Sequence, residues 1–177
     1  LGNGTETYGY AVSVASSGNV YISGVTRNSI DGEPYSGSVD MFVAKYNSAG
    51  TRQWTRMLGT SRQESCYGVA VDGSENVYVS GSSYGNFDGL ANSDATLMSE
   101  DIFLVKYNSS GTKQWSRFYG ETGSNVTVGL AVDGSGNAYL AGNTNAALEG
   151  VTPAGGQDLI LITYATSGAW QWTRRLG

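Results

Sequence analysis

Short runs of alternating apolar and polar residues, separated by turns rich in Gly, Ser, Asn and Asp, follow one another along the whole chain. A period of two residues is typical of β-strands that bury one face. The clearest alternation occurs in residues 10–14, 67–71 and 128–132. Almost continuous apolar runs, which predict strands covered on both faces, occupy residues 41–46, 102–107 and 159–164. The pattern therefore predicts an all-β fold.

The same pattern occurs three times. Spacings of 57, 61 and 57 residues separate the dipeptides Leu1-Gly2, Leu58-Gly59, Tyr119-Gly120 and Leu176-Gly177. Self-similarity over such a period indicates a repeat architecture. We predict repeats at residues 1–57, 58–118 and 119–175, with residues 176–177 starting a further repeat. The second repeat carries four extra residues in its long loop.

Two aromatic positions keep their register in every repeat. They are Tyr21, Tyr78 and Tyr139 in the second predicted strand and Trp54, Trp115 and Trp172 in the fourth. A repeated four-stranded unit of roughly 40–60 residues with an aromatic residue at a fixed point is typical of a β-propeller blade. We therefore predict three β-propeller blades, each a four-stranded antiparallel repeat.

Two stretches carry a resemblance to a known family. Residues 132–142 read V-D-G-S-G-N-A-Y-L-A-G, and residues 101–115 read D-I-F-L-V-K-Y-N-S-S-G-T-K-Q-W. This combination resembles the SBBP repeat of bacterial seven-bladed β-propellers and is more distantly similar to NHL-type blades. The resemblance covers the chain in three copies. It implies a secreted or cell-surface bacterial propeller, usually without enzymatic activity of its own.

Three blades do not close a ring, because propellers typically have four to eight blades. Two blade faces therefore stay open, and stacked repeats stabilise one another by burying such faces. We expect the open faces to meet either further blades of a longer chain or other copies of this chain. The longer chain is the simpler of these two interpretations.

Composition excludes several classes of function. The chain has no His and one Cys, Cys66, which excludes a Ser-His-Asp triad, an internal disulfide and the commonest zinc sites. A net charge of −5 argues against nucleic acid as a partner. No apolar run approaches the length of a membrane span. No signal peptide is visible, which is expected for a mature piece or an excerpt.

The charges are distributed unevenly. A meander of four strands places the long loops and the repeat-joining loops on one face, which we call the loop face. That face holds 12 of the 15 acidic residues but only two of the ten basic ones, so its net charge is −10. It either attracts cations and cationic partners or forms a solvated rim. We predict that the chain requires no cofactor. Ca²⁺ is the cation that the carboxylate oxygen atoms of the loop face would suit, although the sequence contains no EF-hand spacing.

Residues that recur once per repeat are expected to fasten blades rather than to bind ligands. Asp40, Asp101 and Asp158 precede the third strand of each repeat, where carboxylates cap backbone N–H groups. Trp54, Trp115 and Trp172 are expected to pack between blades in preference to forming a platform for sugars.

Residues found in one repeat only are better candidates for ligand binding, because loops on a rigid scaffold carry specificity. The candidate ligand residues are Tyr35, Tyr84, Asn86, Phe87, Asp94 and Glu100. A speculative metal set precedes a Gly in each long loop and consists of Asp31, Asp88 and Glu149. We predict no catalytic residue.

Three functions remain open. The first, which we favour, is a non-enzymatic extracellular or cell-surface scaffold that binds a protein, a glycan or a cation through the loop face. The second is a structural unit that closes or polymerises through its open blade faces. The third is a glycoside-processing enzyme, which needs two carboxyl groups about 5–10 Å apart.

Overall fold

The computed structural model describes residues 6–94, 96, 98–121, 123–147 and 156–177. These residues form twelve strands and no helix, which confirms the all-β prediction. The strands are β1 (Thr7–Val14), β2 (Val20–Thr26), β3 (Asp40–Tyr46), β4 (Arg52–Leu58), β5 (Glu64–Val71), β6 (Val77–Ser83), β7 (Asp101–Tyr107), β8 (Lys113–Tyr119), β9 (Asn125–Val132), β10 (Ala138–Thr144), β11 (Asp158–Tyr164) and β12 (Trp170–Leu176).

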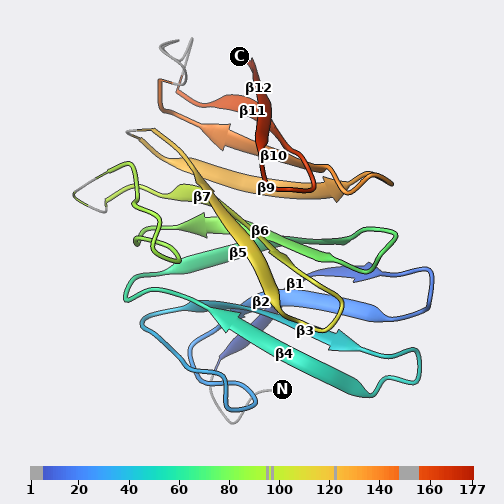
Figure 1. Cartoon of the computed structure of the whole chain (residues 1–177). Coiled ribbons are helices and arrows are strands. Elements are labelled where there is room, and N and C mark those ends of the chain that lie inside the picture. The colour runs from blue at the N-terminus through green and yellow to red at the C-terminus, as the bar shows by residue number, and fades with distance from the viewer. Residues whose placement is uncertain (1–5, 95, 97, 122, 148–155) are drawn as a thin grey trace.

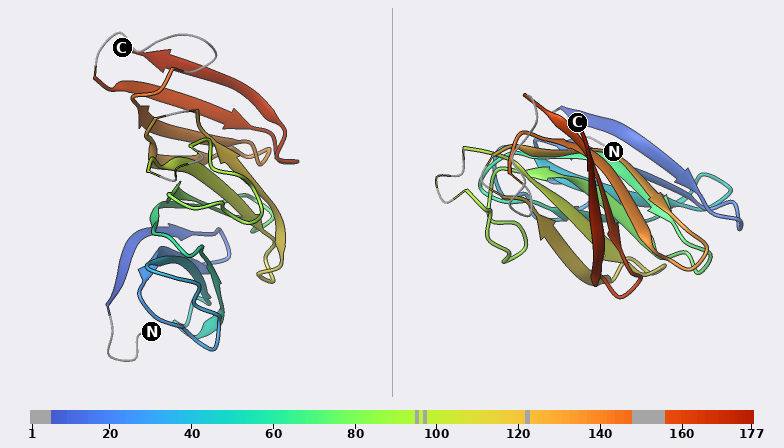
Figure 2. Two further views of the ribbon diagram at one scale, coloured as in Figure 1. Left: turned by 90° about the vertical axis from the view of Figure 1, so that its left-hand side faces the viewer. Right: turned by 90° about the horizontal axis from the view of Figure 1, so that it is seen from above.

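The strands form three separate four-stranded antiparallel sheets, β1–β4, β5–β8 and β9–β12, each in chain order. We call them the first, second and third blades. They stack one on another, with β5 packed on β1 and β9 packed on β5 (Figures 1 and 2). This is the predicted arrangement of propeller blades. The predicted repeat boundaries lie one residue before the ends of β4 and β8, since Leu58 and Tyr119 close those strands.

The third strands are deeply buried in the first two blades. Every residue of β7 is buried, and so are all but the last of β3. The prediction of strands covered on both faces is therefore confirmed for these two. In β11, Leu159 is exposed, because among the described residues no blade covers the outer face of the third blade.

One extra residue interrupts the pairing of the first and second strands in every blade. The unpaired residues are Tyr10, Tyr67 and Val128. A bulge of this kind re-aims its side chain, and all three side chains are exposed. Opposite the bulge, a Cβ on Gly24 or Gly81 would lie 1.8 Å from a carbonyl oxygen of the first strand. This close approach explains why the repeat keeps a glycine there.

Two apolar clusters fill the two junctions between blades. The cluster between the first and second blades includes the side chains of Met41, Val43, Val69 and Phe103. The cluster between the second and third blades contains residues such as Ile102 and Leu140 together with their neighbours in β11. Burial of apolar area at these junctions is what holds the blades together.

Candidate functional site

The acidic residues of the long loops are mostly engaged within the protein. Asp31 forms an ion pair with Arg52 on the outer strand β4, at 2.8 Å, and accepts a hydrogen bond from Thr55. Asp88 accepts equivalent bonds from Lys113 and Ser116 on β8. These carboxylates therefore fasten the long loops to the outer strands.

The speculative metal set is not assembled by the structure. Asp31 and Asp88 belong to different blades and both have left-handed backbone conformations, with φ of 57° and 52°, at the turn of each loop. Glu149 lies outside the described residues. Among the described residues, no three acidic or thiol side chains are placed to share a metal ion. The Ca²⁺ expectation thus gains no support from this part of the chain.

The recurring aspartates are all buried, and each is the first residue of the third strand of its blade. Asp40 accepts a hydrogen bond from the backbone N–H of Ser36, at 2.7 Å, as predicted for a capping carboxylate. Asp101 accepts the N–H of Ser93 and, across the junction, the side-chain amide of Asn125 at 3.1 Å. Burial raises the pKa of Asp40 and of Asp101 above the usual value.

Asp158 differs from these two residues. Its carboxylate pairs with Arg175 of β12 in its own blade. The three recurring aspartates therefore all act within the blade stack, but through different partners.

Two of the candidate ligand residues pack against the blade that carries them. Phe87 is fully buried and stacks on Phe103 of β7, with ring centroids 4.4 Å apart. Its ring is not accessible to a ligand. Tyr35 is half-buried against the cluster of Ile30, Phe42 and Met57, and its hydroxyl donates to the carbonyl of Ser38. Both side chains hold a long loop against its blade.

The other four candidates lie in the long loop of the second blade. Asp94 accepts hydrogen bonds from the hydroxyl of Thr96 and from the N–H groups of Thr96 and Met98, and these bonds, the hydroxyl bond first, lower its pKa. Asn86 is exposed, and its carbonyl oxygen accepts the N–H of Asn92.

The structure places Tyr84 near Glu100, whose charge raises the pKa of the tyrosine. Burial raises the pKa of Glu100 itself. Tyr84 also lines a hollow of about 440 Å³ together with Arg62, Gln63, Met98 and two serines. Of the six candidates, Tyr84 is the one that lines this hollow.

The recurring aromatic residues make contacts between blades. The indole N–H of Trp54 donates to the carbonyl of Ser109 in the second blade, at 3.1 Å. Trp115 donates to Thr166 in the third blade in the same way, at 3.2 Å. Trp172 occupies the same position on the outer face of the third blade, where no such partner is present among the described residues.

The recurring tyrosines of the second strands also donate hydrogen bonds to the next blade where one is present, but their acceptors differ. The hydroxyl of Tyr21 donates to Glu75 in the second blade, and that of Tyr78 donates to the carbonyl of Gly136 in the third. Tyr139, on the third blade, instead donates to Asp133 of its own turn.

Glu75 is a junction residue that the sequence analysis missed. Its carboxylate accepts hydrogen bonds from Ser17, Asn19, Tyr21 and Lys45, all in the first blade. These donors lower the pKa of Glu75 from 4.5 to about 2. The sequence did contain a sign that Glu75 is special, because glycines occupy the equivalent turn positions of the other two blades.

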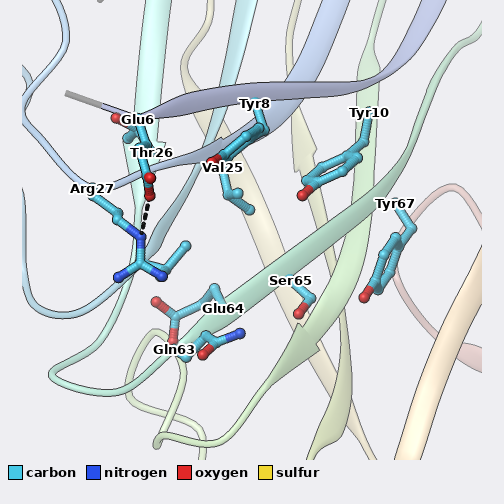
Figure 3. Close-up of a pocket in the computed structure, with 11 residues that line it drawn as sticks. Glu6, Tyr8, Tyr10, Val25, Thr26, Arg27, Gln63, Glu64, Ser65 and Tyr67 are labelled. Carbon is cyan, nitrogen blue, oxygen red and sulfur yellow. Dashed lines mark ion pairs between the residues drawn. The ribbon is translucent and has the colours of Figure 1, made fainter. Parts of the chain in front are cut away.

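A hollow lies between the first and second blades, at the loop-face ends of β1 and β5. It has a volume of about 180 Å³, and Tyr8, Tyr10 and Tyr67 form its aromatic wall. Figure 3 shows Tyr8 and Tyr10 extending from β1 and Tyr67 approaching from β5. We call it the tyrosine cleft. The sequence analysis missed it because its wall is formed by two repeats together.

Charged groups of the tyrosine cleft are already paired. Glu6 forms an ion pair with Arg27 at 3.1 Å. Glu64 is buried and accepts hydrogen bonds from Thr60 and Ser83. Burial raises the pKa of Glu64 to about 7.

Comparisons with known proteins agree with the fold. The family model of the SBBP β-propeller repeat matches residues 53–88 and 114–148. The chain is 30% identical over 153 residues to the Regulatory protein FlaEY of Caulobacter vibrioides, a match that covers 82% of this chain and 16% of that protein. It is 24% identical over 177 residues to an uncharacterised WD repeat-containing protein of Acanthamoeba polyphaga mimivirus, covering 80% of this chain and 13% of that protein.

Both relatives are thus several times longer than the chain. Within the described residues, the structure contains no helix with the length and apolar character needed to cross a membrane.

Proposed function

We propose that this chain, which contains SBBP β-propeller repeats, is a non-enzymatic part of a larger propeller scaffold that binds a partner through its loop face. Further blades cover its two outer faces. The function of the blades in this proposal is to hold the loop face rigidly, since a rigid scaffold is what positions binding loops.

The burial of equivalent valines carries the proposal. In the second blade, Val69 is 7% exposed and Val71 packs against the cluster between the first and second blades. Their counterparts in the first blade, Val12 and Val14, are 64% and 61% exposed. These equivalent positions are therefore buried where a preceding blade is present and exposed where none is.

The opposite end of the stack shows the same contrast. Met41 and Ile102 are at most 2% exposed, whereas the equivalent Leu159 is 47% exposed. Leu176, paired with Leu159 across the sheet, is 75% exposed. Single exposed apolar residues are ordinary, but a contiguous apolar sheet face marks an interaction surface.

The outer face of the third blade would fit a further blade whose turn between the third and fourth strands resembles those of the second and third blades. At both internal junctions the tryptophan and an arginine of the fourth strand donate to carbonyls in the turn between the third and fourth strands of the next blade. Arg56 donates to Gly111, and Arg117 donates to Gly168. Arg174 and Trp172 present the same pair of donors at the outer face.

Light scattering on a size-exclusion column tests this part of the proposal. We expect the mass of a single chain and strong binding of a hydrophobic dye. Replacing Val12 and Val14 with serine should reduce dye binding without unfolding the chain, since both side chains are exposed. A clean mass of two chains would instead assign a second copy as the occupant, and absence of dye binding would contradict the open faces.

An extracellular or cell-surface location, implied by the SBBP resemblance, belongs to the same proposal. It predicts that an antibody against the chain labels intact source cells, and labelling only after lysis would contradict it. The enzymatic alternative has little support from the geometry. That alternative needs two available carboxyl groups in the loops, and the loop carboxylate of Asp88 is held by Lys113 and Ser116 on the outer strand.

A further inference from the structure

We propose that the tyrosine cleft binds an uncharged oligosaccharide, with one sugar ring against Tyr8 and Tyr10 and its hydroxyl groups bonded to Gln63 and Ser65. This inference rests on the proposed binding role of the loop face and names the ligand class. It follows from the aromatic wall, the paired charges, the polar side chains and the extent of the cleft.

The aromatic wall is an open platform. Tyr8, Tyr10 and Tyr67 are 47%, 54% and 40% exposed, although each lies beside another ring. The rings of Tyr8 and Tyr10 are close to parallel, at 22° with centroids 6.4 Å apart, and Tyr67 follows at 6.1 Å from Tyr10. An aromatic face is electron-rich, so it attracts the weakly positive C–H groups on the flat side of a sugar ring.

The charges of the cleft favour a neutral ligand. Its charged lining residues are Glu6, Arg27 and Glu64. Glu6 and Arg27 neutralise each other, and Glu64 is buried and already accepts hydrogen bonds from Thr60 and Ser83. An anionic ligand would meet a protein of net charge −5, and a cationic ligand would have to compete with Arg27 for Glu6, whereas a neutral sugar does neither.

The polar side chains suit hydroxyl groups. Gln63 carries two N–H donors and a carbonyl acceptor, and Ser65 carries a hydroxyl that both donates and accepts. A sugar hydroxyl also donates and accepts, so it can satisfy either side chain in several orientations. Ligand sites typically combine an apolar wall with a few such polar groups.

The extent of the cleft indicates a chain of sugars rather than one ring. The tyrosine cleft has a volume of about 180 Å³, which is small for a ligand site. Gln63 also lines the neighbouring hollow of about 440 Å³ that contains Tyr84 and Met98. An oligosaccharide with its end in the tyrosine cleft would therefore continue past Gln63 to Tyr84.

The repeat itself supplies a variant that should keep the fold. Val128 occupies the bulge position of Tyr10 and Tyr67 in the third blade. Tyr10→Val thus places in the first blade a residue that the same bulge already carries. Val128→Ala is the matched control, because Val128 is equally exposed but lies outside the cleft.

The test is an array of neutral and acidic oligosaccharides, followed by a fluorescence titration with the best neutral oligosaccharide. We expect binding that changes little with salt, an affinity about tenfold lower in Tyr10→Val, and no change in Val128→Ala. Absence of neutral binders, or equal affinity in Tyr10→Val, would overturn the carbohydrate assignment.

A peptide library screened with the same variants separates the two proposals. Peptide binding that Tyr10→Val weakens would overturn the sugar while preserving a partner site on the loop face. Failure of sugars and peptides alike would overturn both.

Discussion

Replacing Glu75 with glutamine should loosen the junction between the first two blades. The substitution keeps the shape of the side chain but removes the charge that Lys45 faces at 3.0 Å. It also turns the hydrogen bonds from Ser17 and Tyr21 into neutral ones. Hydrogen bonds to charged groups are worth about 1.5–3 kcal/mol, against roughly 1 kcal/mol for neutral ones.

The pKa of Glu75 gives an upper bound. A decrease from 4.5 to about 2 corresponds to at most about 3 kcal/mol of stabilisation of the folded state. The side chain is 21% exposed, so we expect a smaller loss of about 1–2 kcal/mol in the free energy of unfolding. For a domain of this size that lowers Tm by roughly 3–6 °C.

The pH dependence distinguishes a charge effect from a packing effect. An acid with a lowered folded-state pKa stabilises the fold above its unfolded pKa, and this stabilisation is lost as the pH falls towards the folded value. The Tm difference between wild type and Glu75→Gln should therefore be full at pH 6–7 and should shrink between about pH 4.5 and pH 2.

Thermal unfolding followed by circular dichroism measures both effects. Glu6→Gln is the control, because its ion pair with Arg27 is exposed and should be worth less than about 0.5 kcal/mol. Equal Tm values for wild type and Glu75→Gln at pH 7 would refute the junction role. A Tm difference that persists unchanged at pH 2.5 would refute its electrostatic origin.

Three further predictions follow from the burial and contacts of single side chains. Trp54→Phe should cost about 1 kcal/mol through the lost bond to Ser109, whereas Trp172→Phe should cost almost nothing, as measured by denaturant unfolding. Phe87→Ala should cost about 3–5 kcal/mol because it empties a fully buried site, and a change below 1 kcal/mol would contradict its place in the core. Glu64 has a pKa raised to about 7, so wild-type stability should fall by roughly 1–3 kcal/mol between about pH 4.5 and pH 8; Glu64→Gln should flatten that decline in Tm.

The fold was predictable from the sequence because each repeat encodes it independently. Strand periodicity, the Gly–Asn turns and the spacing of Trp54 and Trp115 all predict the same four-stranded unit, and consistency between levels is what specifies a fold. The recurrence of a glycine at Gly24 and Gly81 also has a local cause in the bulge opposite.

The candidate site was harder to predict because it depends on contacts between repeats. Phe87 is in a loop by sequence, yet its ring reaches the core beside Phe103. Asp31 and Asp88 count as charges of the loop face, yet both reach basic residues on the outer strands. Strand periodicity does not report how far a loop folds back over its own blade.

The most direct test of the open blade faces is the thermal unfolding of a four-blade fusion, made by placing a second copy of residues 60–119 directly after Gly177. The added turn would offer the donors of Trp172 and Arg174 the carbonyl acceptors that Ser109 and Gly111 provide at the first junction. We predict one cooperative transition at a higher Tm than the three-blade chain, and a cost of about 1 kcal/mol for Trp172→Phe in the fusion only. Two independent transitions, or an unchanged Tm with Trp172→Phe neutral in both proteins, would contradict the proposal that these faces receive further blades.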